Sequence, residues 1–182
     1  MKIGIILGSI REGRNGEAVA KWVQQAADAR GTADYQTIDL KSFNVPLLTS
    51  ATVPAAAGKQ YDSAEAQAWS AAIDACDAFV FVTPEYNHSL PGAFKNAVDT
   101  LGAEWEGKAI GFVSYGSDAG IRVVEAWRSV VANFQMTDVR AQVALSLFTD
   151  FGADGFAPQD MRAAALTTLF DQVEAATAKL RD

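Results

Sequence analysis

The sequence contains one cysteine and one histidine in 182 residues. Because Cys76 has no second cysteine to join, an internal disulfide is excluded, and such sparse cysteine usage is typical of a reducing cytoplasm. His88 has no cluster of Cys or His residues beside it, whereas zinc sites are built from several such ligands. We therefore expect a cytoplasmic protein without a metal site.

Long apolar runs and an excess of basic residues are also missing. No apolar run approaches the roughly 20 residues of a membrane-spanning helix, so no membrane partner is expected. The opening MKIGIILGSIREGR lacks a small-residue cleavage pattern, and we interpret its short apolar run as a first strand. Fifteen basic against twenty-two acidic residues give a net charge of −7. Without a basic stripe, no nucleic-acid partner is expected.

Strand-like and helix-like segments alternate along the chain, whose length fits a single domain over residues 1–182. Apolar runs predict strands at 2–7, 34–40, 78–83, 108–114 and 139–147. Helical periodicity predicts helices at about 19–30, from 63, at 92–101, at 119–134 and from 158. This order favours an α/β fold with a five-stranded parallel sheet, in the order 2-1-3-4-5, and helices on both faces. A long irregular segment, about 41–62, is typical of a lid or binding loop.

The three most unusual loops follow strands 1, 3 and 4. In this topology all three lie at the carboxyl edge of the sheet, where open α/β folds bind their ligands. The first loop, GSIREGRNG, leads directly into a helix, whose N-terminus favours anions. Ser9, Arg11 and Arg14 add a hydroxyl and two cations to this anion site. A solvated turn is the alternative, and the spacing fits neither a dinucleotide fingerprint nor a Walker loop.

The second and third loops suit a flat ligand. In TPEYNHSLPG, Tyr86 offers an aromatic face, Asn87 donates and accepts, and the backbone lacks sheet partners. An ordinary loop with a polar helix cap is the alternative here. In SYGSDAG, small residues leave room for a planar group against the backbone. Capping of the next helix by Ser117 or Asp118 is equally compatible with this third loop.

Three segments, GSIREGRNGEAVAKWV, TPEYNHSLPGAFKNAVD and EWEGKAIGFVSYG, resemble the NAD(P)H-dependent FMN reductase family of flavodoxin-like proteins. The similarity runs from Lys2 to about Phe134, and the PEYN segment is its most specific part. Many members have serine where Arg14 stands and asparagine where Gly16 stands. Many also have a glycine pair after strand 4, where this chain continues from Gly116 into serine and aspartate. The resemblance implies a flavodoxin-like three-layer sandwich that binds FMN.

The resemblance also implies a site and a reaction. Its first loop would hold the FMN phosphate, the PEYN loop would line the isoalloxazine, and the third loop would meet the pyrimidine side. NAD(P)H would give a hydride to the flavin, and an acceptor would then take its place and remove the electrons in a ping-pong sequence. Free flavin, quinones, azo compounds and metal oxyanions are the acceptors it implies. No catalytic side chain is assigned, because the cofactor carries the chemistry. The cofactor-binding residues implied are Ser9, Arg11, Arg14, Asn15, Gly16, Glu17, Pro84, Glu85, Tyr86, Asn87, Ser114, Tyr115, Gly116 and Ser117.

Several other residues carry expectations of their own. His88 is expected to pack or cap rather than to catalyse, and Cys76 to be an inert core thiol. Trp105 suits the core, the surface or the rim of a neighbouring subunit's site. The predicted helix 119–134 carries an apolar stripe wider than one sheet contact needs, which predicts a homodimer or a dimer of dimers through this helix and helix 92–101. The stripe consists of Val123, Val124, Trp127, Val130, Val131 and Phe134.

Two other functions fit the same fold. A flavodoxin-type electron carrier shares the fold and the cofactor but needs no nicotinamide site. A non-enzymatic flavin-binding or regulatory protein is the second rival. Fold alone does not separate these classes from a reductase.

Overall fold

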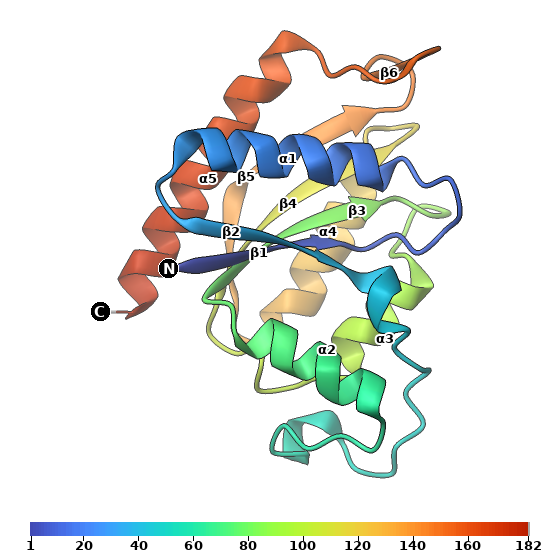
Figure 1. Cartoon of the computed structure of the whole chain (residues 1–182), viewed down its shortest axis with the longest axis vertical. Helices are drawn as coiled ribbons and strands as arrows, with labels where there is room; N and C mark the ends of the chain where they lie inside the picture. The colour runs from blue at the N-terminus through green and yellow to red at the C-terminus, as the bar shows by residue number, and fades with distance from the viewer. Residues whose placement is uncertain (182) are drawn as a thin grey trace.

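A parallel sheet with helices on both faces forms the centre of the molecule (Figure 1). The computed structural model describes residues 1–181. The strand order is β2-β1-β3-β4-β5, and each neighbouring pair runs parallel, as the sequence predicts. The strands are β1 (Lys2–Leu7), β2 (Asp34–Asp39), β3 (Ala78–Pro84), β4 (Ala109–Gly116) and β5 (Thr137–Ser146). The helices are α1 (Gly16–Arg30), α2 (Ala64–Asp74), α3 (Gly92–Asp99), α4 (Ile121–Ala132) and α5 (Asp160–Arg181).

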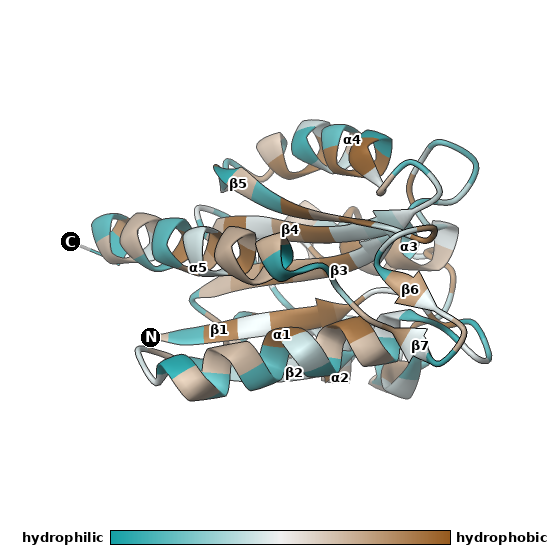
Figure 2. Cartoon of the chain, turned by 90° about the horizontal axis from the view of Figure 1, so that it is seen from above, coloured by the Kyte–Doolittle hydropathy of each residue, from teal (hydrophilic) through white to brown (hydrophobic). Residues whose placement is uncertain are grey.

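The central strands are apolar because helices cover both of their faces. Every residue of β3 and β4 is buried, whereas the edge strands β2 and β5 alternate with exposed positions. Figure 2 shows the central strands mostly in brown and pale shades, whereas teal and brown are mixed on the helices. Burial on both faces therefore explains why the apolar runs locate the strands.

Two cores lie on opposite faces of the sheet. The core under α1 and α5 is mainly aliphatic, with Val19, Val23 and Leu169 among its buried members. The core under α2, α3 and α4 is richer in aromatic side chains, and Trp105 and Trp127 are fully buried in it. Trp105 therefore belongs to the core. Cys76 is also buried there, and burial raises the pKa of its thiol, as expected of an inert core residue.

The start of α4 departs from the sequence prediction. Gly31 ends α1 in the left-handed conformation at φ 64°, as predicted. Ser63 accepts from the Ala66 N–H and caps α2. The N-cap of α4 is Gly120, however, so neither Ser117 nor Asp118 caps this helix. Gly120 has φ 67°, and a Cβ there would lie 2.8 Å from the Ser114 Cβ, so the tight turn requires glycine.

The long segment after β2 is anchored rather than free. It contains two short 3₁₀ helices, η1 (Leu40–Phe43) and η2 (Pro54–Ala56). Asn96 on α3 donates to the Pro46 carbonyl (2.8 Å) and accepts from the Leu48 N–H (2.9 Å). The hydroxyl of Tyr61 donates to the buried carboxylate of Glu104 at 2.8 Å. These bonds hold the segment against α3 and the turn that precedes β4.

A short hairpin, β6 (Phe151–Gly152) and β7 (Gly155–Phe156), was not predicted. The ring of Phe156 packs at 5.6 Å from Trp22 on α1, and Phe151 lies 6.3 Å from Tyr115. Buried Asp150 closes the base of the hairpin by accepting from the Ser146 and Gln159 N–H groups. The hairpin is therefore fixed over one end of α1.

The pairing of β4 with the edge strand β5 is irregular, because its register shifts between Ile110 and Phe112 of β4. Arg128 of α4 donates to the carbonyls of Val139 (3.1 Å) and Arg140 (3.4 Å). The Ala141 N–H donates to the Gln172 side chain at 2.8 Å. Side chains from α4 and α5 therefore bond to backbone groups of β5 in this irregular stretch.

Candidate functional site

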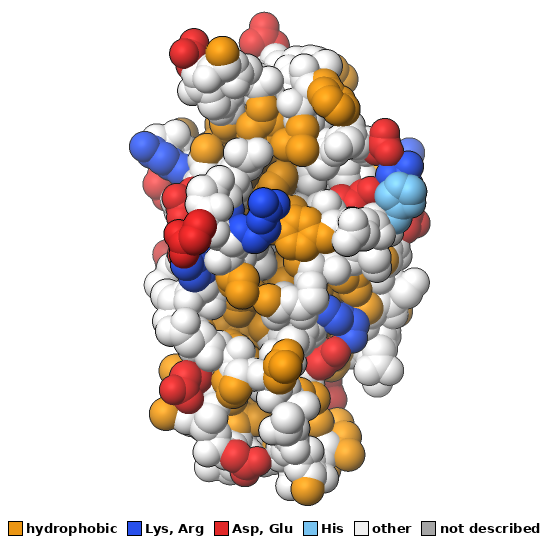
Figure 3. Space-filling model, turned by 90° about the vertical axis from the view of Figure 1, so that its right-hand side faces the viewer, with side chains coloured by type: hydrophobic (Ala, Val, Ile, Leu, Met, Phe, Trp, Pro, Cys, Tyr) orange, Lys and Arg blue, Asp and Glu red, His pale blue; other side chains and the backbone are white. Residues whose placement is uncertain are grey.

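A cavity opens at the carboxyl edge, where the loops after β1, β3 and β4 meet. Chain connections leave β1 and β3 toward opposite sides of the sheet, so this is the switch point of the topology. Figure 3 looks onto this edge and shows basic and apolar side chains along it. The lining residues are Ser9, Arg11, Gly13, Arg14, Asn15, Pro84, Glu85, Tyr86, Tyr115, Gly116 and Leu147. The three predicted loops thus converge on one cavity.

Arg14 is committed to neighbouring carboxylates. Its guanidinium donates to both oxygens of Asp39 (2.8 and 2.6 Å) and to the Ser9 carbonyl, and the side chain is 4% exposed. It also pairs with Glu17 at 2.9 Å. Burial alone would lower the pKa of Arg14, but the bonds to Asp39 and Glu17 outweigh it and raise the pKa. Arg14 therefore ties the first loop to the end of β2, with most of its charge already compensated.

Arg11 is the free cation of the first loop. It is exposed and forms no ion pair among residues 1–181, and its guanidinium lies 5.8 Å from the centre of the Tyr86 ring. The hydroxyls of Ser9 and Tyr86 are 3.0 Å apart, which joins the first loop to the second. Asn15 makes no side-chain bond to the first turn of α1, so it leaves the N–H groups of that turn for a ligand.

The second loop forms a tight turn. Tyr86 and Ser89 exchange two backbone hydrogen bonds, of 3.2 and 3.0 Å. Asn87 and His88 between them have φ values of 50° and 64°, which strain non-glycine residues. His88 is exposed at the tip, so the prediction that it packs or caps is wrong. The Glu85 carboxylate turns away to accept from the Arg122 guanidinium at 2.8 Å and from its N–H at 3.1 Å.

The third loop supplies a buried phenol. The Tyr115 side chain points toward the start of α1, and its hydroxyl has no hydrogen-bond partner in the described part of the chain. Burial raises the pKa of Tyr115, so this phenol remains a proton donor. Ser114 is buried and donates to the Ala119 carbonyl at 2.9 Å, while Ser117 is exposed.

The cavity brings together nine of the fourteen predicted site residues: Ser9, Arg11, Arg14, Asn15, Pro84, Glu85, Tyr86, Tyr115 and Gly116. Five others, Gly16, Glu17, Asn87, Ser114 and Ser117, are outside its lining. Gly13 and Leu147 were missed. The positive φ of Gly13, 60°, suits its glycine in a loop, and Leu147 follows β5, the strand next to β4. The position of Leu147 was therefore available from the topology.

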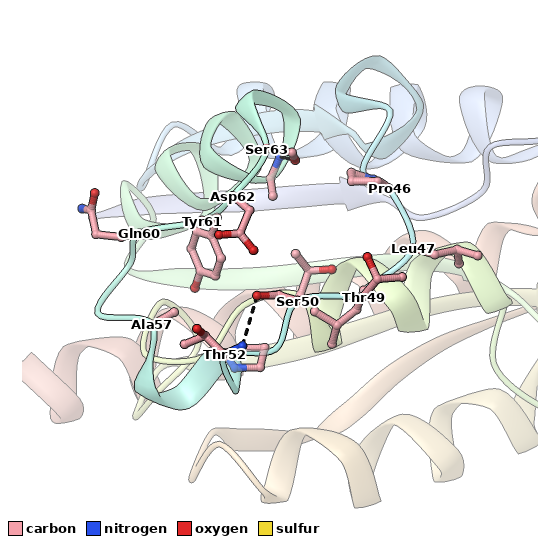
Figure 4. Close-up of a pocket in the computed structure, with 14 residues that line it drawn as sticks. Pro46, Leu47, Thr49, Ser50, Thr52, Ala57, Gln60, Tyr61, Asp62 and Ser63 are labelled. Carbon is pink, nitrogen blue, oxygen red and sulfur yellow. Dashed lines mark hydrogen bonds between the residues drawn. The ribbon is translucent and has the colours of Figure 1, made fainter.

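A second cavity lies under the long segment (Figure 4). Figure 4 shows Tyr61 and Asp62 on one side of it and Ser50 beside Thr52 on the other. The residues that line it are apolar or carry hydroxyl groups, apart from the amide of Gln60 and the carboxylate of Asp62, and they include no Lys or Arg. It therefore does not suit an anionic cofactor, and we assign the candidate site to the carboxyl-edge cavity. No grouping of three His, Cys, Asp or Glu side chains suited to a metal occurs among residues 1–181.

Solved structures share this fold. FerB of Paracoccus denitrificans, described as a flavoenzyme NAD(P)H:(acceptor) oxidoreductase, superposes with a TM-score of 0.75 at 18% identity, covering 96% of this chain and 98% of that one. An archaeal flavodoxin gives a TM-score of 0.63 at 14% identity, covering 97% and 99%. The fold and the carboxyl-edge cavity together define a flavodoxin-like α/β protein.

Sequence comparisons identify the family to which this chain belongs. Residues 1–150 match the family model described as NADPH-dependent FMN reductase, and the chain belongs to this family of oxidoreductases. A protein of Schizosaccharomyces pombe named as an NAD(P)H-dependent FMN reductase is 33% identical, over 82% of this chain and 74% of its own length. One of Nectria sp with the same description is 40% identical, but the match spans only 62% of that relative and 66% of this chain. A quinone reductase of Pseudomonas putida is 29% identical over 82% of both chains. Among the described helices, none combines the length and apolar character needed to cross a membrane.

Proposed function

We propose that this protein binds FMN at the carboxyl-edge cavity and uses it to pass reducing equivalents from NAD(P)H to a small-molecule acceptor. The observation that carries this proposal is the cavity itself. It combines a free arginine, a buried serine hydroxyl and a helix N-terminus on one side with the tight turn of the PEYN loop on the other. Family membership supports the same conclusion.

The residues present fit FMN. Ser9, Arg11 and the first turn of α1 would hold the phosphate, whose negative charge suits them. The backbone of Pro84 to Asn87 would lie against the flavin ring. A Cβ at Gly116 would lie 3.2 Å from the Glu85 Cβ, so glycine keeps the backbones of the second and third loops close together there. The unpartnered hydroxyl of Tyr115 shows that the cavity has donor capacity left for a ligand.

Bound FMN would supply the redox chemistry, accepting a hydride from NAD(P)H and then reducing an acceptor that enters in its place. The residues of this chain bind and orient rather than transfer protons. The Tyr86–Ser89 turn is held by two hydrogen bonds, and the Glu85–Arg122 pair fixes the residue before it. The Tyr86 N–H is occupied by the Ser89 carbonyl, so it is not available to the flavin as the resemblance implies. Backbone donors of Asn87 and Gly116 would be the preorganised ones for charge on the flavin. The quinone reductases among the relatives support quinones as acceptors, beside free flavin, azo compounds and metal oxyanions.

Spectroscopy of the purified protein tests the proposal. Added FMN should bind, and the visible flavin band should bleach when NADH or NADPH is mixed in anaerobically. Reoxidation by a quinone should follow after the nicotinamide has left, giving parallel lines in double-reciprocal kinetics. A flavin band that NAD(P)H leaves unbleached would favour the electron carrier, and failure to bind FMN at all would favour the non-enzymatic rival.

We also propose that residues 1–182 form one FMN-binding domain in a cytoplasmic homodimer. The packing of α5 in the same core as α1 supports one domain. The stripe on α4 does not support the predicted interface, because Val123, Trp127 and Val131 are buried in the chain's own core. The three most exposed large apolar side chains lie on loops: Leu47 is 77% exposed, Val53 65% and Phe148 78%. We place the contact between subunits there.

A further inference from the structure

We propose that the Tyr115 hydroxyl donates a hydrogen bond to the terminal phosphate of FMN, so that strand β4 adds a donor to the phosphate site formed by the first loop and the start of α1. The inference rests on the proposed function and assigns this side chain to the phosphate rather than to the flavin ring. Three observations carry it: an unpartnered donor, the place where it lies, and the platform that holds it there.

Tyr115 is the exception among the tyrosines. The chain has four of them, and the hydroxyls of Tyr35, Tyr61 and Tyr86 are bonded to Glu174, Glu104 and Ser9 respectively. The Tyr115 hydroxyl has no partner within residues 1–181, although the residue is only 5% exposed. Buried hydroxyl groups are normally hydrogen-bonded, so an orphan on the lining of a cavity indicates a ligand atom.

The hydroxyl lies where an anion would bind. A Cβ built at Gly16, the first residue of α1, would be 2.7 Å from it, so it stands at the positive end of that helix. Arg11, Ser9 and Tyr86 are its neighbours in the cavity. Glycine at position 16 leaves the space that the hydroxyl occupies. The Ser9 hydroxyl, bonded to Tyr86 at 3.0 Å, lies in the same cavity and is a second uncharged donor there.

The charge on the first loop explains why a neutral donor is needed. Asp39 and Glu17 already compensate Arg14, so Arg11 is the one cation left in this loop for a phosphate with nearly two negative charges. A phosphate also has three terminal oxygens that accept hydrogen bonds strongly. Uncharged donors must satisfy the rest, and a phenol that stays protonated is one of them.

Three aromatic side chains, Phe151, Phe156 and Trp22, form a platform behind Tyr115 that holds its ring in place. Phe151 of the β6–β7 hairpin packs at 6.3 Å from it, Phe156 lies 5.0 Å from Phe151, and Trp22 contacts Phe156. Asp150 holds this hairpin closed with the help of Arg162, at 3.1 Å. The hairpin lies beyond residues 1–150, which the family model matches, so this chain supports Tyr115 with a segment outside that match.

Binding of FMN and of riboflavin, which lacks the phosphate, tests the proposal by flavin fluorescence quenching. Tyr115→Phe should weaken FMN binding about 10- to 100-fold, as expected for loss of a hydrogen bond to a charged group, and should leave riboflavin binding unchanged. Tyr61→Phe is the matched control, because its hydroxyl bonds to Glu104 away from the cavity, and it should change neither affinity. Thermal unfolding of the flavin-free protein adds a second readout. Tyr115→Phe should unfold at the same temperature as wild type or higher, since it removes an unsatisfied buried hydroxyl.

Equal FMN affinity for wild type and Tyr115→Phe would overturn the proposal. So would an equal loss of FMN and riboflavin binding, which would place the hydroxyl at the flavin ring. If wild type binds neither flavin, the proposed function fails. The role of Tyr115 is then tested separately, by the thermal stabilisation that added inorganic phosphate gives. Stabilisation of wild type but not of Tyr115→Phe by phosphate would then support the anion donor, and no stabilisation of either would refute it.

Discussion

Arg11 and Arg14 are three positions apart in one loop and have different roles. The guanidinium of Arg14 is enclosed between Asp39, Glu17 and the Ser9 carbonyl, and 4% of its side chain is exposed. Arg11 extends over the Tyr86 ring without an ion pair among the described residues. One arginine therefore holds the loop in shape, and the other supplies charge to a ligand.

Measuring the FMN affinity and the stability of variants separately should distinguish the ligand-binding role of Arg11 from the structural role of Arg14. Arg11→Ala should weaken FMN binding about tenfold, with an unchanged melting temperature, because it removes a cation from the site and no internal contact. Arg14→Ala should lower stability by about 1–2 kcal/mol, because Asp39 and the Ser9 carbonyl lose their partner. Titration with FMN and thermal unfolding of both variants provide the comparison. Equal retention of FMN by the two variants would count against the assignment.

His88 offers a test of backbone strain. His88→Gly produces an Asn-Gly pair, which the two left-handed positions of this turn favour, and it should stabilise the protein by about 1 kcal/mol. That corresponds to a melting temperature about 2–4 °C higher for a chain of this size. His88→Ala is the control and should give no gain, because alanine keeps the strain. Unchanged reductase activity in both variants would agree with an exposed, non-catalytic side chain, and a lost activity would contradict it.

At the scale of elements, the buried Asp150 joins the end of β5, the hairpin and the start of α5. Burial by itself would raise the pKa of this carboxyl, but the Arg162 guanidinium and the N–H groups of Gln159 and Ser146 outweigh it and lower the pKa. The folded state therefore favours the ionised form. The resulting stabilisation is complete well above the ordinary aspartate pKa of about 3.9 and is lost as the pH falls through the lower folded value.

Asp150→Asn should reveal this stabilisation. At neutral pH the variant should be less stable than wild type by about 2 kcal/mol, since asparagine cannot pair with Arg162. The difference should shrink as the pH is lowered below about 4, because wild type then becomes protonated at the same position. Denaturant unfolding of both proteins at several pH values measures it. A difference that stays constant down to pH 3 would show that the carboxylate charge is not responsible.

The elements differ in how far their sequences reveal them. The runs of β3 and β4 are apolar on both faces, so composition alone locates them, and the topology then brings their loops together. The β6–β7 hairpin has strands of two residues, too short for any periodicity to show. The pairing of Arg14 with Asp39 spans 25 residues and depends on how β2 lies beside β1. Contacts of this kind decide which predicted side chains face the cavity, and they arise only from tertiary packing.

At the scale of the whole molecule, the exposed apolar side chains on the loops predict self-association. We expect a homodimer at micromolar concentration, because contact between two copies would remove Leu47 and Val53 from water. Light scattering should give twice the chain mass for wild type. Leu47→Ser combined with Val53→Ser should shift the mass toward the monomer, whereas Ile121→Ser, on α4, should leave the dimer intact. A monomeric wild type would refute the prediction.

The irregular stretch of β5, with side chains bonded to its backbone, affects how copies of this chain can associate at high concentration. An open strand edge is a template on which a second chain can add hydrogen bonds and start a fibril. Here Arg128 occupies the carbonyls of Val139 and Arg140, Gln172 occupies the N–H of Ala141, and the register is irregular at that point. A strand that paired with these particular groups would first have to displace the side chains bonded to them. We therefore expect this stretch of β5 to be a poor template for cross-β aggregation, whether or not the flavin site is filled.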